Sequence, residues 1–378
     1  MKKLLSLSLI FISILCIFSG CTINQGDSLD TTKENRTENI SEQQLTNLNC
    51  VDGYKLRVAE LLKNSRLLLA YQNNDDQKYQ FRQYDLKKRS FVYQSEEYST
   101  SDFEINSLCF LSENFYVLSK DCCFVFDFNC NLIQKLPIPE NISERFGTAC
   151  YWLSDDLQKI AYVKNPKLEA EYLYTSASDG QNEKQVRMLE ADLTITGLFF
   201  STDSNYLGFE GVTIPAGKNT SIGCYGYIDL HTMQTTMYPD NKTYVVHQGN
   251  MMLICDKTAA PDATRKGVVK ILNLETKEKA EIVMDTAEEC ETANFGSDVS
   301  FIVGMHKVET THTITFTIYK DGKKINAVDY ICPSEQTYID LSSGGTQIRM
   351  DMETKQIFAF YYNTEQNNYT ILSVPFVG

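Results

Sequence analysis

The chain has 378 residues, of which 43% are hydrophobic and 11% aromatic, and its formal net charge is −14 at pH 7. An acidic surface repels phosphate backbones and anionic lipid headgroups, which argues against a nucleic-acid partner and against membrane contact through a basic patch. The length is sufficient for one large domain with a substantial core.

The first 20 residues have the organisation of an export signal. Lys2 and Lys3 precede an apolar run, and Ser19 and Gly20 stand directly before Cys21. The run, about 15 residues long, is too short to cross a bilayer of about 30 Å comfortably, and small residues before a cysteine suit a peptidase that cuts there. Removal of this segment is favoured over two alternatives, a signal cut elsewhere and an uncleaved anchor helix.

This segment resembles a bacterial lipoprotein signal. Gly20 and Cys21 match the family's pattern, whereas Phe18 stands where the family usually has leucine. The resemblance implies a signal peptide over residues 1–20 and fatty acylation, for example with palmitate, at Cys21. It also implies a location on the extracytoplasmic side of a bacterial cell membrane. Two acyl chains hold a protein on a membrane durably, whereas one chain gives marginal binding.

Residues 21–43 are rich in Asn, Thr, Ser, Glu and Asp and contain almost no large apolar side chain. Such a composition cannot bury enough surface to fold. We therefore expect a disordered polar tether between the anchor and the folded domain. Without Lys2 and Lys3, 33 basic side chains face 49 acidic ones, so the mature chain has a net charge of −16.

Ten of the twelve cysteines follow Cys21 and are spread over the whole domain. Several stand inside apolar, strand-like runs, where cysteine serves as a small core residue, so buried thiols are favoured over a disulfide framework. Export permits disulfides, however, and Cys122, Cys123 and Cys130 are close enough in sequence to pair across a hairpin. These three lack the second close pair and the nearby histidine that are typical of a zinc site.

Residues 44–378 contain a repeat that predicts a β-propeller. Short apolar and aromatic runs recur at residues 67–71, 115–118, 160–163, 206–209, 252–255, 301–303 and 357–361. Their spacing of roughly 45 to 55 residues suits one four-stranded blade each. We predict an all-β domain of seven blades, with residues 44–50 completing the last blade because an open blade would expose a strand edge. Six or eight blades and two stacked sandwiches are the alternatives.

A second landmark precedes the apolar run in two units, as WLSDD at residues 152–156 and FSTDS at residues 200–204. An aromatic residue, then Ser-x-Asp, then a β-rich strand resembles the repeats of TolB-like and WD-type propellers. The resemblance implies the fold and nothing specific about function. We interpret Asp155 and Asp203 as equivalent turn caps of their repeats rather than as catalysts.

No catalytic, cofactor or metal site is predicted. The Gly-x-Ser-x-Gly signature of a serine nucleophile is absent, and the nearest approximation, at residues 342–345, is typical of a turn. His306 and His312 could share a strand face, but a loop between them is favoured. Asp127, Asn129 and Asn131 lack the glycine and glutamate of a calcium loop, so a hairpin turn is favoured there.

Three longer inserts, at residues 165–171, 213–220 and 256–266, should emerge on one rim of the disk and form a binding face. The leading hypothesis is a membrane-anchored binding or assembly module for a protein, peptide or glycan. The alternative is a propeller enzyme of the polysaccharide lyase, glycosidase or peptidase class with a central-channel site. A third option is a sensor domain coupled to a membrane partner. A convergent polar cluster in a central pocket would indicate an enzyme, and an aromatic patch on the looped rim would indicate a binder.

Overall fold

The computed structural model describes residues 45, 48–73, 75–99, 101, 108–119, 121–145, 148–164, 171–189, 193–214, 222–240, 243–256, 268–283, 290–296, 299–343 and 346–377. The signal peptide, Cys21 and the tether lie outside these residues, so the boundaries proposed for them stay predictions. Within the described ranges, every helix is too short or too polar to span a lipid bilayer.

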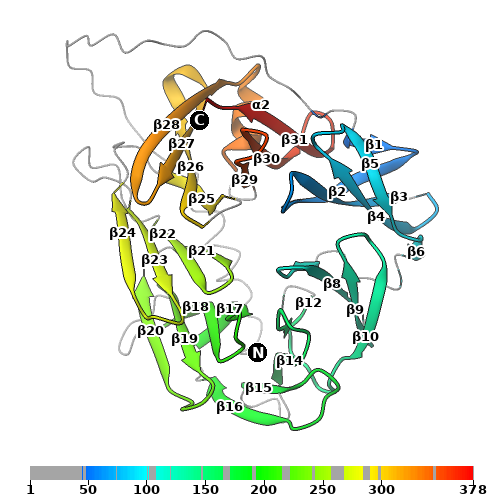
Figure 1. The fold of residues 1–378 in the computed structure, drawn as a ribbon, viewed down its shortest axis with the longest axis vertical. Helices are drawn as coiled ribbons and strands as arrows, with labels where there is room; N and C mark the ends of the chain where they lie inside the picture. Colours follow the sequence, from blue (N-terminus) through cyan, green and yellow to red (C-terminus); the bar gives the residue numbers. More distant parts are fainter. Residues whose placement is uncertain are drawn as a thin grey trace, which may run out of the picture. The chain divides into compact units, whose positions relative to one another are not determined.

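The described strands form eight antiparallel sheets, of which seven are the blades of a β-propeller arranged around a central axis, and the eighth is a short two-stranded pair (Figure 1). The first blade contains β1 (Cys50–Val51), β2 (Tyr54–Leu62), β3 (Arg66–Asn73), β4 (Lys78–Asp85), β5 (Ser90–Gln94) and β6 (Tyr98–Ser99). The second contains β7 (Cys109–Phe110), β8 (Asn114–Leu118), β9 (Cys122–Asp127) and β10 (Leu132–Pro137), and the short pair β11 (Glu144–Arg145) and β12 (Thr148–Ala149) follows it. The predicted fold class is confirmed.

The remaining blades follow in chain order. The third contains β13 (Tyr151–Leu153), β14 (Lys159–Lys164), β15 (Glu171–Ala177) and β16 (Lys184–Leu189), and the fourth β17 (Leu193–Phe200), β18 (Tyr206–Thr213), β19 (Ile222–Asp229) and β20 (Thr235–Asp240). The fifth contains β21 (Thr243–Gln248), β22 (Met251–Asp256), β23 (Val268–Asn273) and β24 (Lys279–Val283). The sixth contains β25 (Cys290–Phe295), β26 (Phe301–Val308), the 3-10 turn η3 (Glu309–Thr311), β27 (Thr313–Lys320) and β28 (Lys323–Ile331). Helix α2 (Glu335–Leu341) leads into the seventh, which contains β29 (Gln347–Asp351), β30 (Gln356–Asn363) and β31 (Asn368–Pro375).

The apolar runs that revealed the repeat form β3 in the first blade and the second strand of each other blade. In β3, β14 and β30 most residues on both faces are buried, because each blade is covered by a neighbour on either side. Within β8, Val117 packs toward the first blade while Tyr116 and Leu118 pack toward the third. Burial on both faces gives a continuous apolar run instead of an alternating one.

The hydrophobic core is divided among the junctions between blades. Among the described residues, seven clusters of buried side chains lie one at each junction between neighbouring blades, including the junction between the last and the first. The outer strands β5, β10 and β28 are mostly exposed. Stability therefore depends on contact between blades, and every blade needs two neighbours.

The ring closes differently from the prediction for residues 44–50. Among the described residues the last blade has three strands, and β1 pairs with β2 of the first blade. Asp52 and Gly53, with φ of 54° and 82°, form a two-residue turn that folds β1 back onto β2. Asp-Gly is a preferred sequence for this turn because both residues tolerate positive φ. This local hairpin takes the place of a strand shared with the last blade.

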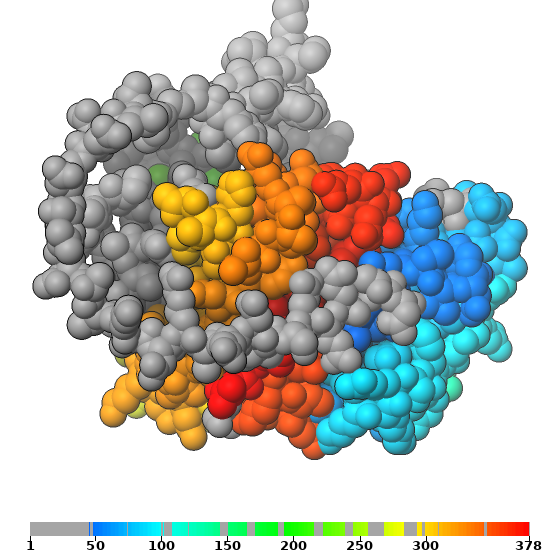
Figure 2. Space-filling model, turned by 90° about the horizontal axis from the view of Figure 1, so that it is seen from above, coloured from blue at the N-terminus to red at the C-terminus, as the bar shows by residue number. Residues whose placement is uncertain are grey.

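The same segment nevertheless seals the junction between the last and first blades through its side chains. Leu48 is fully buried in a cluster that includes Phe358 and Phe360 of β30. Asn49 Nδ2 donates a hydrogen bond to Thr370 Oγ1 of β31 over 3.2 Å. Figure 2 shows the last blade, in red, beside the first blade, in blue.

Cys122, Cys123 and Cys130 are free thiols, the alternative that the sequence favoured over a disulfide. Cys123 and Cys130, which could have paired across a hairpin, are buried in different junctions, one toward the third blade and one toward the first. Burial raises the pKa of Cys130 to about 12. These cysteines serve as small core residues.

Candidate functional site

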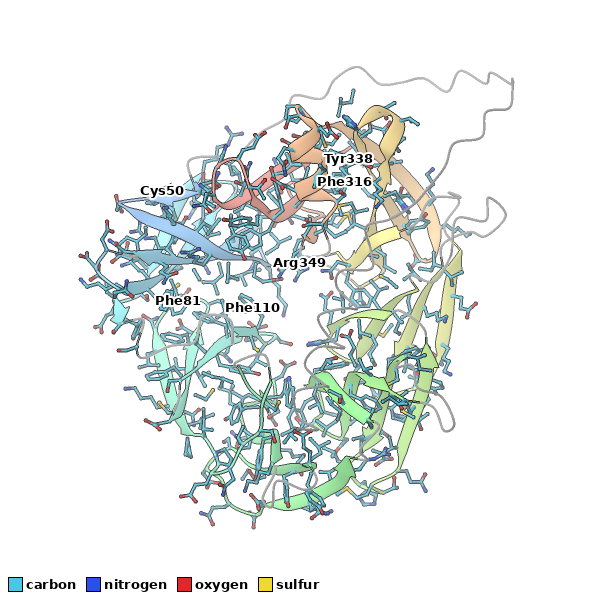
Figure 3. The ribbon with its side chains drawn as sticks, turned by 180° about the vertical axis from the view of Figure 1, so that it is seen from behind. Cys50, Phe81, Phe110, Phe316, Tyr338 and Arg349 are labelled. Carbon is cyan, nitrogen blue, oxygen red and sulfur yellow. The ribbon has the colours of Figure 1, made fainter. Side chains whose placement is uncertain are left out.

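A cavity of about 220 Å³ lies on the central axis and is lined by residues from all seven blades. Most of the lining residues stand at the ends of the innermost strands and in the turns that follow them, and Phe128 stands in the turn between β9 and β10. They include Glu60, Phe110, Asp155, Phe199, His247 and Arg349. Figure 3 shows Arg349 and Phe110 beside the central space, whereas Cys50 and Phe81 lie farther out. This cavity is the candidate functional site.

The cavity opens on the rim formed by the turns between the first and second strands of each blade. The three expected inserts start where β14, β18 and β22 end. These three strand ends are equivalent, and they lie at the end of the blades opposite to the turns that line the cavity. Almost all the residues of these inserts lie outside the described ranges, so the predicted binding face stays a prediction.

An ion pair between Glu60 and Arg349 joins the first and last blades at the cavity wall. Arg349 Nε donates to Glu60 Oε1 over 2.6 Å, and Arg349 Nη2 donates to Glu60 Oε2 over 2.8 Å. Arg349 Nη1 donates to the carbonyl oxygen of Ile348 over 2.9 Å. The arginine and glutamate side chains are 24% and 13% exposed. Bidentate geometry and partial burial make this pair stronger than an ordinary surface ion pair.

Asp155 is held in the cavity wall by a residue of the preceding blade. The backbone N–H of Ser112 donates to Asp155 Oδ1 over 3.0 Å, and the Ser112 hydroxyl donates to Asp155 Oδ2 over 2.7 Å. Two donors on one carboxylate fix its orientation at the rim.

The structure corrects the interpretation of Asp155 as a turn cap. In the third blade the cap is Asp156, whose Oδ1 accepts from the Ser154 hydroxyl over 2.6 Å, while in the fourth blade Asp203 accepts from Ser201 over the same distance. Asp156 is therefore the equivalent of Asp203, and Asp155 is left free to bridge two blades. Aligning the two motifs on their serines instead of on the first aspartate identifies this difference.

His247 stacks on Phe199 of the preceding blade, with ring centroids 4.0 Å apart and an interplanar angle of 1°. The imidazole is open to the cavity. The surrounding blades nevertheless lower its pKa, because desolvation disfavours the charged form; Asp155 opposes this effect and Arg349 adds to it. His247 is therefore neutral at pH 7.

Gly208 makes room for this stack. It lies opposite Phe199 in the strand pair, and a Cβ at position 208 would stand 2.2 Å from the phenyl ring. We expect Gly208→Ala to displace Phe199 and to lower the free energy of unfolding by about 1–3 kcal/mol, as overpacking does. Thermal or urea unfolding measures this loss, and the NMR shifts of the His247 ring protons should change with it.

Gly197→Ala in the adjacent strand is the matched control, because a Cβ there meets its nearest neighbour, in Glu210, at 3.8 Å. Its effect should stay within about 0.5 kcal/mol. Equal stability of the two variants would contradict the packing role of Gly208.

The other residues considered from the sequence lie apart from the cavity. His306 is buried within β26, and His312 stacks on Tyr338 with ring centroids 5.3 Å apart. Asp127 accepts the backbone N–H of Asn131 over 2.8 Å, which is the expected hairpin turn. Among the described residues, no three His, Cys, Asp or Glu side chains are grouped so as to hold a metal ion.

Sequence reasoning missed Glu60, His247 and Arg349. Each stands at or near the end of an innermost strand, shortly before the turn to the apolar second strand. The signal that could have found them is this position, read across the seven units, for charged or aromatic side chains.

No family model and no curated protein matches this chain. Among solved structures, an oligogalacturonate lyase in complex with manganese is 10% identical, with 83% of this chain and 86% of that chain aligned at a TM-score of 0.55. A prolyl endopeptidase is 8% identical at a TM-score of 0.50, and the alignment covers 87% of this chain and 51% of that one. The β-propeller domain of Myceliophteria thermophila Cps50 (Swd1) is 10% identical and aligns 88% of this chain with all of that one, at a TM-score of 0.49. At such identities, likeness shows the fold alone. The chain is a seven-bladed β-propeller.

Proposed function

We propose that this protein is a lipid-anchored, extracytoplasmic binding module that holds its ligand in the central cavity. The observation that carries the proposal is the composition of the cavity wall, which combines charged groups with phenylalanines from several blades. Concave sites with an apolar lining and a few oriented polar groups are typical of ligand binding. The signal-like residues 1–20 and Cys21 supply the location.

The state of the polar groups favours binding over catalysis. Arg349 is bonded to Glu60, and the Ser112 hydroxyl donates to a carboxylate and not to a histidine. His247 stacks against a phenyl ring. These groups support one another across blades, and rigid support of this kind suits recognition of a ligand's shape and charge.

The test is capture from cell-envelope extract by the full-length protein, with identification by mass spectrometry. Gln248→Trp places a large ring at the cavity, because Gln248 lines it at the end of β21. Gln134→Trp is the matched control on the exposed outer strand β10. We expect Gln248→Trp to lose the captured species and Gln134→Trp to retain them. Identical capture by both variants would show that the cavity is not the binding site.

The convergence of Asp155 and His247 on one cavity also favours a second candidate, a propeller enzyme. A carboxylate and a neutral imidazole in one site are suited to general acid–base chemistry. Turnover of an oligogalacturonate or a prolyl peptide that disappears in Asp155→Asn would support this candidate. Turnover that survives the substitution would place the chemistry elsewhere.

A further inference from the structure

We propose that the central cavity receives a cationic group, an ammonium or guanidinium, at the carboxylate of Asp155. The proposal rests on the proposed binding function and adds the chemical class of the ligand.

The first argument is the charge balance of the cavity wall. Two cations of the described residues line the cavity, and both have partners: Arg349 pairs with Glu60, and Lys63 Nζ lies 2.7 Å from Glu113 Oε1. The ion pairs of the described residues leave Asp155 without a cationic partner. Its carboxylate therefore remains as an unbalanced negative charge at the cavity.

The second argument is the geometry of that carboxylate. Ser112 donates two hydrogen bonds to Asp155, and within the described part of the chain the remaining acceptor positions of the two oxygens are open to a ligand. An ionised carboxylate accepts about four hydrogen bonds in all. Because the two donors come from one side, the open positions have a fixed direction. A fixed carboxylate with spare acceptors binds a donor-rich cation without first having to be ordered.

The third argument is the remainder of the wall. Phe110 and Phe128, both partly exposed, line the same cavity, and the faces of aromatic rings attract cations. His247 is neutral at pH 7 and so does not repel a cation. The chain as a whole carries 49 acidic against 35 basic residues, which draws cations toward it. The aromatic rings, the neutral histidine and the net negative charge all favour a cation in the cavity, as the Asp155 carboxylate does.

Three probes with one ring and different charge test the proposal: benzamidine, which is cationic at pH 7, benzamide, which is neutral, and benzoate, which is anionic. Each is titrated calorimetrically into the full-length protein in detergent. We expect benzamidine to bind at least about tenfold more tightly than benzamide and benzoate, the ratio that one good charge-assisted contact gives. Equal binding of benzamidine and benzamide would overturn the cationic preference.

Asp155→Asn tests the residue itself. It removes the charge while keeping the shape of the side chain, and we expect it to abolish the preference for benzamidine. Asp156→Asn is the matched control, because the neighbouring carboxylate caps the turn through Ser154 and lies outside the cavity wall. A preference that survives Asp155→Asn would overturn the assignment. If Asp155→Asn does not fold, the comparison of the three probes in the unmodified protein still tests whether the cavity prefers a cation.

Failure of this inference can be told from failure of the proposed function. If benzamide binds as well as benzamidine and Gln248→Trp blocks both, the cavity binds ligands without preferring cations. If capture from extract is unchanged in Gln248→Trp, the proposed function fails as well. A second arm titrates a capped peptide with a central arginine: tighter binding than benzamidine indicates a side chain of a partner, and weaker binding indicates a free small cation.

Discussion

Arg349→Met should lower the free energy of unfolding of the full-length protein by about 2–4 kcal/mol, because breaking a largely buried ion pair leaves the Glu60 carboxylate without its cation. Glu60, only 13% exposed, would lose both hydrogen bonds that the guanidinium donates to it. The loss falls at the junction between the last and the first blade. A urea titration followed by tryptophan fluorescence measures it, since Trp152 is the single tryptophan.

Lys63→Met is the matched control, because Lys63 and Glu113 also join neighbouring blades but are 64% and 72% exposed. Exposed pairs contribute about 0–1 kcal/mol, so this variant should unfold nearly as the parent does. The double variant Glu60→Met with Arg349→Met should recover part of the stability, because no unpaired charge remains. If Arg349→Met and Lys63→Met had equal effects, the closing role of the pair would be wrong.

This pair matters because of how the ring closes. The first blade folds its own N-terminal strand back at Asp52 and Gly53, so the described strands of the last and first blades share no backbone ladder. Side chains make the connection instead. Besides Glu60 and Arg349, the Ser65 hydroxyl donates to Glu353 Oε2 over 2.9 Å, and Lys87 also pairs with Glu353. The junction therefore depends on polar contacts together with its hydrophobic cluster.

The fold could be predicted from the sequence because one physical constraint repeats seven times. In each blade, the strand that carries the apolar run lies between two neighbouring blades and must be apolar on both faces. This produces a run that is visible without any alignment. The closure could not be predicted in the same way. Residues 44–50 form a strand-like segment outside the seven units, and the prediction assigned it to the last blade. The turn at Asp52 and Gly53 pairs it with the first blade instead.

The candidate site was beyond reach of the sequence for a different reason. Glu60 and Arg349 stand 289 positions apart and meet only because the ring closes. Asp155 stands next to a true turn cap, and a shift of one residue in aligning two repeats exchanges a cap for a cavity residue. In a ring of repeats, the residues on the axis come from equivalent positions of different units. The residues that share the cavity can be identified only after the seven units are aligned with an accuracy of one residue.

The location of the protein remains a prediction from its first 21 residues, and Cys21→Ser tests it. A serine hydroxyl cannot form the thioether that holds the lipid, so the variant should carry no acyl chains. We expect the parent protein to enter the detergent phase of a Triton X-114 extraction and to incorporate radiolabelled palmitate, and Cys21→Ser to do neither. Losing the acyl chains removes durable anchoring altogether, because each buried methylene contributes about 0.8 kcal/mol to membrane binding.

Cys50→Ser is the control for this experiment, because Cys50 is an exposed free thiol in the first blade and far from the signal in sequence. It should partition and label as the parent does. Palmitate incorporation that survives Cys21→Ser would place the lipid on another residue. Membrane association without any labelled lipid would instead identify residues 4–18 as a retained anchor helix. The protein would then be anchored in the membrane by a peptide segment and not by a lipid modification.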